Sequence, residues 1–477
     1  MASAVSESRN GCSLSFQKIV DVFLGSENLP FANLLSAERI KRVFHKHGCL
    51  FGIHGVYSTA IVVWSFLSQV LRDGKEASCQ AAVARIVSYC NSHGFAAPTR
   101  DTGDYCRARA KLSAPALKEL ACEVAKELED GVDPEWLWKS KYHVKVVDGS
   151  TLTMPDTAKN QAAYPQQRCQ KPGVGFPIAR FAVVVSLATA CVMDLAIAPF
   201  RGKETGESAL LRTMLKSFCA GDIAVMDRYN CSFMMLALLL GQGTQVCARK
   251  HHLRHSDFRR GKRLGKYDHL IVWTRPTRPA WMDEETYRQI PEKLELREIR
   301  FSVVVPGRRT KSIDIITTLT DASEHSKEDI AELYGFRWNT ELDIRSSKSN
   351  LNLGHVRCKS PEMVQRELWA TMLGYNLVRS TAAAAALLHR KTPRTISFTA
   401  TCQYILASWM QLSSKMIATT KLDEYRNAIL EQIAACQVGN RPGRLEPRVL
   451  KRRRDNAYDL MMKPRNVLRQ ELRKLCT

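Results

Sequence analysis

The spacing of apolar residues divides the chain into a helical beginning, a strand-rich middle and a helical end. Within residues 1–139 apolar positions recur at helical spacing. They predict amphipathic helices near 36–47, 56–72, 77–93, 102–112 and 114–129. Polar and Gly/Pro-containing stretches separate these helices, and none of them carries a chemical motif. A small helical region with exposed Arg and Lys is compatible with DNA binding and equally with packing alone.

The pattern changes at residue 141. "YHVKVVDGSTLTM" alternates into a β-branched run and predicts a strand that ends at Asp148, and "ARFAVVVSLATA" and "CVMDLAIAPF" predict two more strands. A helix in "ESALLRTMLKSF", a strand in "DIAVMD" ending at Asp227, a helix in "CSFMMLALLLG" and a strand in "QVCARK" follow. Three successive strands, and then strands that alternate with helices, predict a mixed α/β sheet.

The segment 251–321 differs again. "HLIVWTR", "REIRFSVVV" and "IDIITTL" predict strands among Pro, Gly and basic residues, without a long helix, so this segment is expected to be a β-rich insertion. Helical periodicity returns in "SKEDIAELYGFRWNTELDIRSSK" and continues in "SPEMVQRELWATMLGYNLVRSTAAAAALL". The predicted fold class is α/β, with helical N-terminal and basic helical C-terminal regions.

Charge narrows the class of partner. The 477 residues are 45% hydrophobic and 25% charged, which is ordinary, but the net charge of +23 predicts a polyanionic partner. A membrane is disfavoured, because the most apolar stretch, 56–67, is much shorter than the roughly 20 residues of a spanning helix. No signal-peptide pattern opens the chain, and the basic block "LKRRR" near the C-terminus is a candidate nucleic-acid contact. Nucleic acid is the expected partner.

The fifteen cysteines are scattered and form no C-x-x-C pair. This pattern favours free thiols in a reducing cytoplasm over a disulfide framework or a zinc site. "HHLRH" at 251–255 is the one histidine cluster, and it lacks a second group of ligands nearby in the sequence.

Three carboxylates fall where they can converge. Asp148 and Asp227 are predicted at the ends of the first and fourth strands, and Glu341 on the helix after the insertion. Carboxylates so placed can hold two divalent cations, and Mg²⁺ or Mn²⁺ suits oxygen ligands. Two such ions, about 4 Å apart, activate a water or a 3′ hydroxyl and stabilise the leaving oxygen in phosphodiester displacement.

The helix that carries Glu341 has an unusual face. Tyr334, Arg337, Glu341 and Lys348 fall within about 60° of one another around a single helix, with Arg345 at the edge of this stripe. Arg337 and Lys348 are suited to hold phosphate oxygens. Tyr334 can donate a hydrogen bond to phosphate or stack on a displaced base. The stripe is predicted to handle phosphate.

These residues resemble a known family. Tyr334-x2-Arg337-x3-Glu341-x6-Lys348 matches the signature of DDE transposases of the insertion sequence four family. Over about 145–380, further blocks resemble that family in its order: "VVDGST", "FPIARF", "FRGKETGESALLR", "DRYNCSF", "GKYDHLIVW", "RCKSPEMVQRELWA" and "LGYNLVR". The resemblance implies an RNase H-like mixed-sheet core interrupted by a β-rich insertion. The expected domains are a helical DNA-end-binding domain (1–139), two parts of the core (140–250 and 322–395) around the insertion (251–321), and a basic helical region for dimerisation or DNA contact (396–477).

The resemblance also implies the reaction: cleavage at the ends of a mobile element and joining of the freed 3′ hydroxyls to target DNA, with two Mg²⁺ or Mn²⁺ ions. The implied partners are double-stranded DNA, as terminal inverted repeats and target, and a second protomer. Some relatives form a hairpin with a flipped base supported by a tryptophan, for which Trp273 and Trp281 both qualify. The implied site consists of a catalytic, metal-binding triad, Asp148, Asp227 and Glu341, and the DNA-binding residues Tyr334, Arg337 and Lys348.

Two other functions stay open: a metal-dependent RNase H-like nuclease without strand transfer, and a catalytically silent transposase-derived DNA-binding protein. Metal-dependent cleavage separates the latter from an enzyme. His251-x-x-Arg254 followed by Tyr287 superficially resembles the order in tyrosine recombinases, but the intervening segment is not helical in pattern and that chemistry does not use the three carboxylates. There is no G-x-x-x-x-G-K-[ST], so nucleotide hydrolysis has no visible site.

Overall fold

The structure is a computed structural model that describes residues 34–52, 56–92, 96–303, 311–351, 353–413, 421–438 and 462–475. It divides into two compact units. The helical unit draws on residues 1–130, 152–177 and 346–477, and the sheet unit on 131–151 and 178–345. Each unit combines residues from separate parts of the chain. The block "LKRRR" lies outside the described residues.

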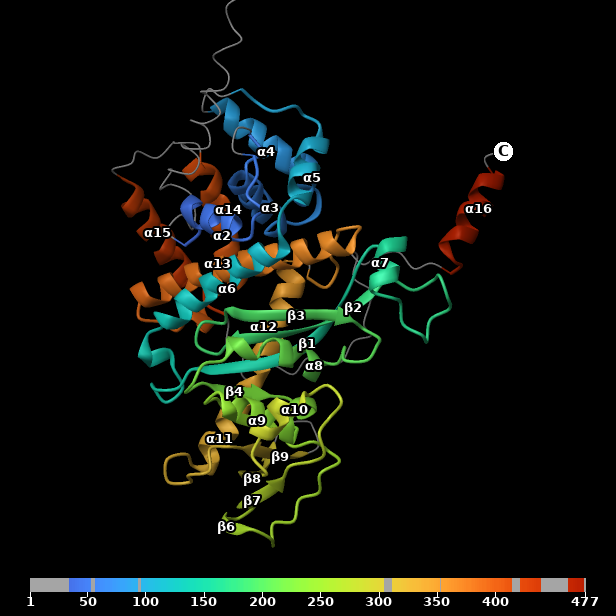
Figure 1. The fold of residues 1–477 in the computed structure, drawn as a ribbon. Coiled ribbons are helices and arrows are strands. Elements are labelled where there is room, and N and C mark those ends of the chain that lie inside the picture. Colours follow the sequence, from blue (N-terminus) through green and yellow to red (C-terminus); the bar gives the residue numbers. More distant parts are fainter. Residues whose placement is uncertain are drawn as a thin grey trace, which may run out of the picture. The chain divides into compact units, whose positions relative to one another are not determined.

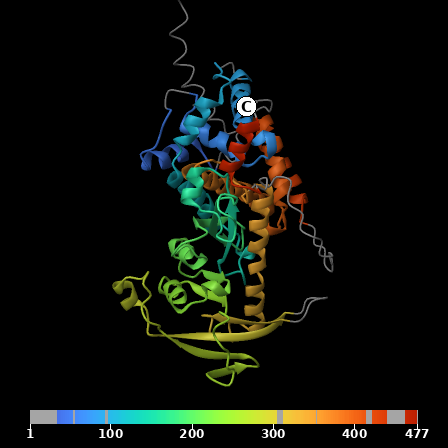
Figure 2. The same cartoon turned by 90° about the vertical axis from the view of Figure 1, so that its right-hand side faces the viewer.

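The predicted N-terminal helices are present, and most of their observed ends lie within one or two residues of the predicted ones. The helical unit contains α2 (Ala37–Lys46), α3 (Thr59–Val70), α4 (Cys79–Ser92), α5 (Thr102–Ala110), α6 (Ala114–Asp130), α7 (Ala158–Ala163), α13 (Pro361–Leu388), α14 (Phe398–Ser413), α15 (Leu422–Ala435) and α16 (Arg465–Leu475). In both views the blue N-terminal helices lie beside the orange and red helices α14 and α15 (Figures 1 and 2).

The core of this unit is built around α13, which is buried along most of its 28 residues and packs on α3, α6, α14 and α15. Asn376 in α13 donates a hydrogen bond to the carbonyl of Ala121 in α6 (3.0 Å). Trp64 of α3 and Trp409 of α14 meet edge to face, with ring centroids 5.4 Å apart. Residues from both ends of the chain therefore close one core.

Several cations of α2 are engaged within the unit. Arg39, Arg42 and Lys46 form ion pairs with Glu127, Glu123 and Glu119 of α6, at 2.5, 2.7 and 2.7 Å. Exposed pairs of this kind stabilise a fold by about 0–1 kcal/mol each. This face of α2 is thus oriented towards α6.

The sheet unit contains one mixed sheet of nine strands. Its elements are β1 (Val144–Thr153, of which the last two residues belong to the helical unit), β2 (Ile178–Ser186), β3 (Val192–Pro199), α8 (Glu207–Thr213), β4 (Ile223–Met226), α9 (Phe233–Gly241), β5 (Gln245–Arg249), β6 (Lys262–Gly265), β7 (Asp268–Thr274), α10 (Glu284–Gln289), β8 (Lys293–Val303), β9 (Lys311–Thr317) and α11 (Lys327–Gly335), followed by the start of α12 (Arg337–Asn350).

The strand order is β3-β2-β1-β4-β5-β9-β8-β7-β6 (Figure 1). β1 pairs with β4, and β4 with β5, in parallel, whereas β2 and β3 are antiparallel. The first five strands therefore have the order and orientations of an RNase H-like sheet, as predicted. The insertion is β-rich, also as predicted, but its strands extend the same sheet, because β9 pairs antiparallel with β5.

Two sequence-based boundaries were wrong. The first strand does not end at Asp148: β1 continues to Thr153, whose backbone N–H donates to the carbonyl of Gly354, a partner that local sequence cannot reveal. The expected helix through residues 326–348 is divided at Phe336. There the N–H of Asn339 donates to the carbonyl of Phe336, a tightened turn of three residues.

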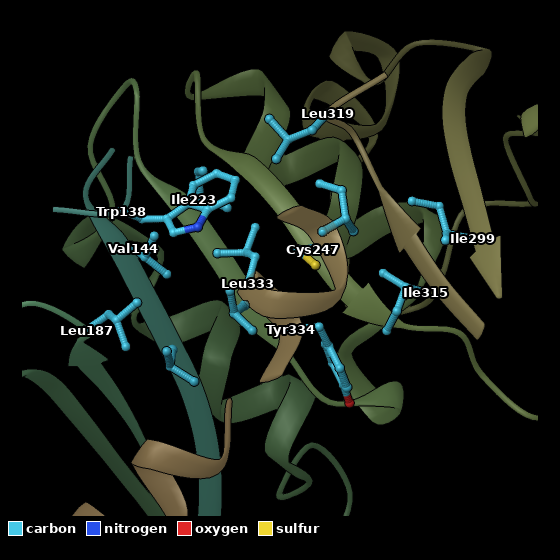
Figure 3. Close-up of a cluster of buried hydrophobic side chains, with 13 residues drawn as sticks. Trp138, Val144, Leu187, Ile223, Cys247, Ile299, Ile315, Leu319, Leu333 and Tyr334 are labelled. Atoms are coloured by element: carbon cyan, nitrogen blue, oxygen red, sulfur yellow. The ribbon is translucent and has the colours of Figure 1, made fainter. Parts of the chain in front are cut away.

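A buried apolar cluster packs α11 against the sheet. Val144, Ile223, Cys247, Ile315 and further apolar side chains of β1, β4, β5 and β9 pack against Ile330, Leu333 and Tyr334 of α11 (Figure 3). These strands supply β-branched residues that suit a buried, pleated surface. Packing against these strands thus fixes α11, and with it the start of α12.

Two further expectations concern the chain as a whole. The thirteen cysteines among the described residues are all free, as predicted. No helix in the described ranges has both the length and the apolarity needed to cross a membrane.

Candidate active site

Two of the predicted acids lie at the same level of adjacent parallel strands. Val146 of β1 is paired with Val225 of β4, and Asp148 and Asp227 each follow two residues later. Asp227 comes directly after β4, and its Oδ1 accepts a hydrogen bond from the N–H of Arg228 at 2.6 Å, which caps a short 3₁₀ turn, η4 (Arg228–Asn230). The expectation that strand ends bring these two carboxylates together agrees with this register, although β1 itself continues.

The third acid, Glu341, is linked to Asp148 by the guanidinium of Arg337. Glu341 lies one helical turn after Arg337 in α12, and Arg337 Nη2 donates to Glu341 Oε1 at 2.8 Å. The Nη1 atom of the same guanidinium is 3.9 Å from Asp148 Oδ1. Arg337 is largely buried, with 12% of its side chain exposed. A single guanidinium therefore bridges an acid from the sheet and an acid from the helix.

The pKa of Asp148 departs from the ordinary value of an aspartate. Its pKa is raised to about 6, chiefly because it is buried. The backbone N–H of Gly149 and the charge of Arg337 act in the opposite direction, while Glu341 and Glu207 raise the pKa further. Burial and nearby like charges disfavour the ionised form of a carboxyl group, and a nearby cation would stabilise that form.

Tyr334 lies differently from what a surface stripe predicts. Its ring is only 5% exposed and belongs to the core cluster, and its oxygen points away from the labelled apolar side chains (Figure 3). Burial raises the pKa of Tyr334 to about 12; Arg337 opposes this shift and Asp227 adds to it. Stacking of this ring on a base is excluded in this arrangement, and the hydroxyl is the group that remains for a hydrogen bond.

Lys348 is the predicted residue that falls outside the sheet unit. It lies seven residues after Glu341 on α12, and its aliphatic stem packs beside Gly354 within the helical unit. The structure thus brings together Asp148, Asp227, Arg337 and Glu341 with the hydroxyl end of Tyr334.

The tryptophans in and near the site differ in exposure. Trp273 is 8% exposed and lies under the guanidinium of Arg254, 3.8 Å from its ring centroid. Trp281 is partly buried under Arg212, at 3.9 Å. Trp338, the neighbour of Arg337, is 60% exposed. Sequence reasoning missed Trp338 because its position inside a helical pattern does not indicate which face is open.

A fourth carboxylate, Glu207 at the start of α8, was also missed. Its pKa is raised by burial and by Asp227, while Arg180 opposes the shift. It is therefore within electrostatic reach of Asp227, and it acts in turn on Asp148. In the sequence Glu207 stands in a predicted helix and within the family block "FRGKETGESALLR", but neither marks it as a site residue.

The donor set suits a hard divalent cation. No three His, Cys, Asp or Glu side chains in the described part of the chain are gathered closely enough to form a finished metal cage. Instead, the guanidinium of Arg337 lies between Asp148 and Glu341, where it supplies the positive charge. The side chains present are oxygen donors, one of them with a pKa raised by burial and by like charge, so the residues fit Mg²⁺ or Mn²⁺.

An RNase H-like sheet with acids on adjacent strands and on a flanking helix defines a nucleic-acid phosphoryl transferase. The family described as "Transposase DDE domain" matches residues 139–377, half of the chain. The chain is 24% identical over 405 residues to the transposase InsG of insertion sequence element IS4 from Escherichia coli strain K12, covering 82% of this chain and 85% of that protein. The chain therefore belongs to the DDE transposases, and among them it is similar to the transposase of element IS4.

It is an enzyme of DNA transposition, which cleaves and transfers DNA strands, and its family uses divalent metal ions. Among solved structures, a piggyBac transposase synaptic complex with hairpin DNA is similar over 91% of this chain and 88% of that one. The TM-score is 0.41 and the sequence identity 9%.

Proposed function

We propose that this transposase moves a bacterial insertion sequence by cutting both DNA strands at its terminal inverted repeats and joining the freed 3′ ends to target DNA. Asp148, Asp227 and Glu341 would hold two Mg²⁺ or Mn²⁺ ions. Arg337 and Lys348 would hold phosphates of the DNA end, and the hydroxyl of Tyr334 would donate a hydrogen bond to one of them.

One observation carries this proposal: Arg337 binds Glu341 and lies beside Asp148, which is level with Asp227 on the adjacent strand. In this arrangement the guanidinium of Arg337 lies next to the proposed metal-binding acids. It could exchange its carboxylate partners for a phosphate of the DNA once metal ions neutralise these acids. The Nε atom of Arg337 is buried and has no hydrogen-bond partner among the described residues, so this guanidinium retains donor capacity.

The residues of the chain would act mainly by positioning. The bound ions supply the positive charge that stabilises the transferring phosphoryl group. Burial around Asp148 keeps water away, which strengthens each charge interaction in the site. Arg337 presents a planar fork that suits two phosphate oxygens, while Lys348 contributes a point charge.

A hairpin at the element end would require a ring that accepts a flipped base. Trp273 is buried and Trp281 is covered by Arg212 at 3.9 Å, whereas Trp338 is 60% exposed although the guanidinium of Arg337 lies 5.2 Å from its ring centroid. We therefore favour Trp338 as the stacking surface for an unpaired base, because stacking needs an accessible face.

The remaining parts of the proposal concern assembly and place. The helical region within 1–139 would recognise the element end, and the region 396–477 would contribute to dimerisation or DNA contact. Acting on two ends implies two protomers in the DNA complex. The free cysteines suit a reducing bacterial cytoplasm.

The test is an end-cleavage assay with labelled DNA that carries the terminal repeats flanking the gene, in Mg²⁺ or in EDTA. Glu341→Ala is expected to bind the ends and to lose cleavage, and Lys348→Ala to weaken end binding mainly. Glu332→Ala, an exposed acid on α11, is the matched control and should cleave normally. Cleavage without joining would indicate a nuclease, and equal loss of binding in Glu341→Ala would contradict the catalytic assignment.

A further inference from the structure

Glu207 makes an unusually close approach to β1. Its Cδ and Oε1 atoms lie 2.6 and 2.8 Å from the place that a Cβ would occupy on Gly149, the residue after Asp148. Any side chain at this position would meet the carboxyl group. The glycine therefore allows Glu207 to lie directly against the backbone of β1 beside one of the proposed metal ligands.

The start of α8 is also fixed to the turn that carries Asp227. The hydroxyl of Ser208 donates to the carbonyl of Tyr229 at 2.7 Å and lies 2.9 Å from Oδ1 of Asn230. On the other side, Arg180 of β2 donates to the carbonyl of Thr205 at 3.3 Å, just before the helix. These contacts hold α8 to both β2 and the η4 turn, and thus fix the position of Glu207.

Glu207 lies within electrostatic reach of the cation Arg180 and of the acids Asp227 and Asp148. Among the described residues it forms no ion pair, while Glu204, three residues earlier, is exposed and pairs with Arg212. Burial and the neighbouring Asp227 raise the pKa of Glu207. A carboxylate held by packing beside other acids is a candidate ligand for a cation.

We propose that Glu207 is a fourth carboxylate of the metal site and binds the divalent ion held by Asp148 and Asp227. The inference rests on the proposed function of the triad, but it adds a residue from a different element, α8. If Glu207 binds the ion, the affinity for metal depends on the three acids and also on the packing of α8 against Gly149 and the η4 turn.

The test is Mn²⁺ binding to the purified full-length protein, followed by the EPR signal of free Mn²⁺, without DNA or turnover. Glu207→Gln keeps the shape that packs on Gly149 and is expected to bind Mn²⁺ about 10- to 100-fold more weakly. Glu204→Gln is the matched control and should bind as the wild type does. Gly149→Ala, which obliges the Glu207 carboxyl to move, should weaken binding as well, and the double variant should add little.

Other outcomes separate the two proposals. If Asp148→Asn weakens Mn²⁺ binding and Glu207→Gln does not, the role of Glu207 is wrong and the triad stands. If neither substitution weakens binding, the proposed metal site itself fails. A melting temperature of Glu207→Gln in EDTA several degrees below that of the wild type would show that Glu207 serves the fold, and would overturn the inference. An equal or higher melting temperature supports it.

Discussion

Replacing Asp148 with Asn should make the metal-free protein more stable at neutral pH while it abolishes cleavage. Burial is the main reason that the pKa of Asp148 is about 6 instead of 3.8. The side chain is 16% exposed, so solvent screens it only weakly. Asn has nearly the same shape and carries no charge. The substitution therefore removes the unfavourable charge and leaves the packing almost unchanged.

The magnitude follows from the two pKa values. The unfolded chain loses the proton near pH 3.8 and the folded protein near pH 6, so between these values the folded state holds a proton that the unfolded state has lost. Stability therefore falls as pH rises from about 4 to about 6 and is level above that. At 1.36 kcal/mol per pKa unit the loss is about 3 kcal/mol at pH 7.5 and about 1.5 kcal/mol at pH 5.

The assay compares thermal unfolding of the wild type and Asp148→Asn in EDTA at both pH values. For a unit of this size about 3 kcal/mol corresponds to a rise of roughly 6–12 °C in melting temperature, which is an upper limit. At pH 5 the rise should be about half as large. Mn²⁺ should stabilise the wild type more than the variant. A variant that is no more stable than the wild type at pH 7.5, or a gain that does not change with pH, would refute the reasoning.

Three more substitutions test other parts of the sheet unit. Lys145→Ala should destabilise the fold by about 3–5 kcal/mol in urea titrations, because it leaves Asp222 charged, buried and without the partner that now lies 2.6 Å away. Arg337→Ala should move the pH-dependent loss of stability to higher pH, since Arg337 lowers the pKa of Asp148; an unchanged pH profile would contradict this. Trp338→Ala should change stability by no more than about 0.5 kcal/mol, yet weaken binding of end DNA with an unpaired base by about 1–3 kcal/mol relative to fully paired DNA, measured by fluorescence anisotropy.

The pattern of apolar residues predicted the strands and helices whose formation depends on neighbouring residues in the sequence. The apolar run before Asp148 and the run "IAVM" before Asp227 predicted β1 and β4, because buried parallel strands require continuous apolar residues. From these strands the pairing of the two acids followed, since parallel strands place the residues after them at one edge. Helical spacing predicted that Arg337 and Glu341 share one face. The ion pair between them is a finding of the structure, because the sequence pattern assigned Arg337 to phosphate.

What the sequence did not predict depends on contacts between distant residues. The continuation of β1 depends on Thr153 meeting Gly354, about 200 residues later, and the joining of the insertion to the sheet depends on β9 pairing with β5. The burial of Tyr334 depends on which side of α11 the sheet covers, and a helical wheel gives no information about that. Glu207 enters the site only because Gly149 leaves room for it.

The position of Arg337 explains how such a site can exist in a folded protein before any metal ion binds. Acids drawn from β1, from η4 and from α12 repel one another, and the raised pKa of Asp148 reflects part of that repulsion. Arg337 reaches both Asp148 and Glu341 because its two terminal nitrogens extend in different directions, which a lysine ammonium on a single stem does not reproduce. Divalent ions bound by the same acids would take over this neutralising role. The guanidinium would then be released from its carboxylates next to the place where a phosphate of the DNA end must lie. We expect the same arginine to stabilise the metal-free fold and to hold DNA once ions are bound, which would account for a buried cation paired with both Asp148 and Glu341.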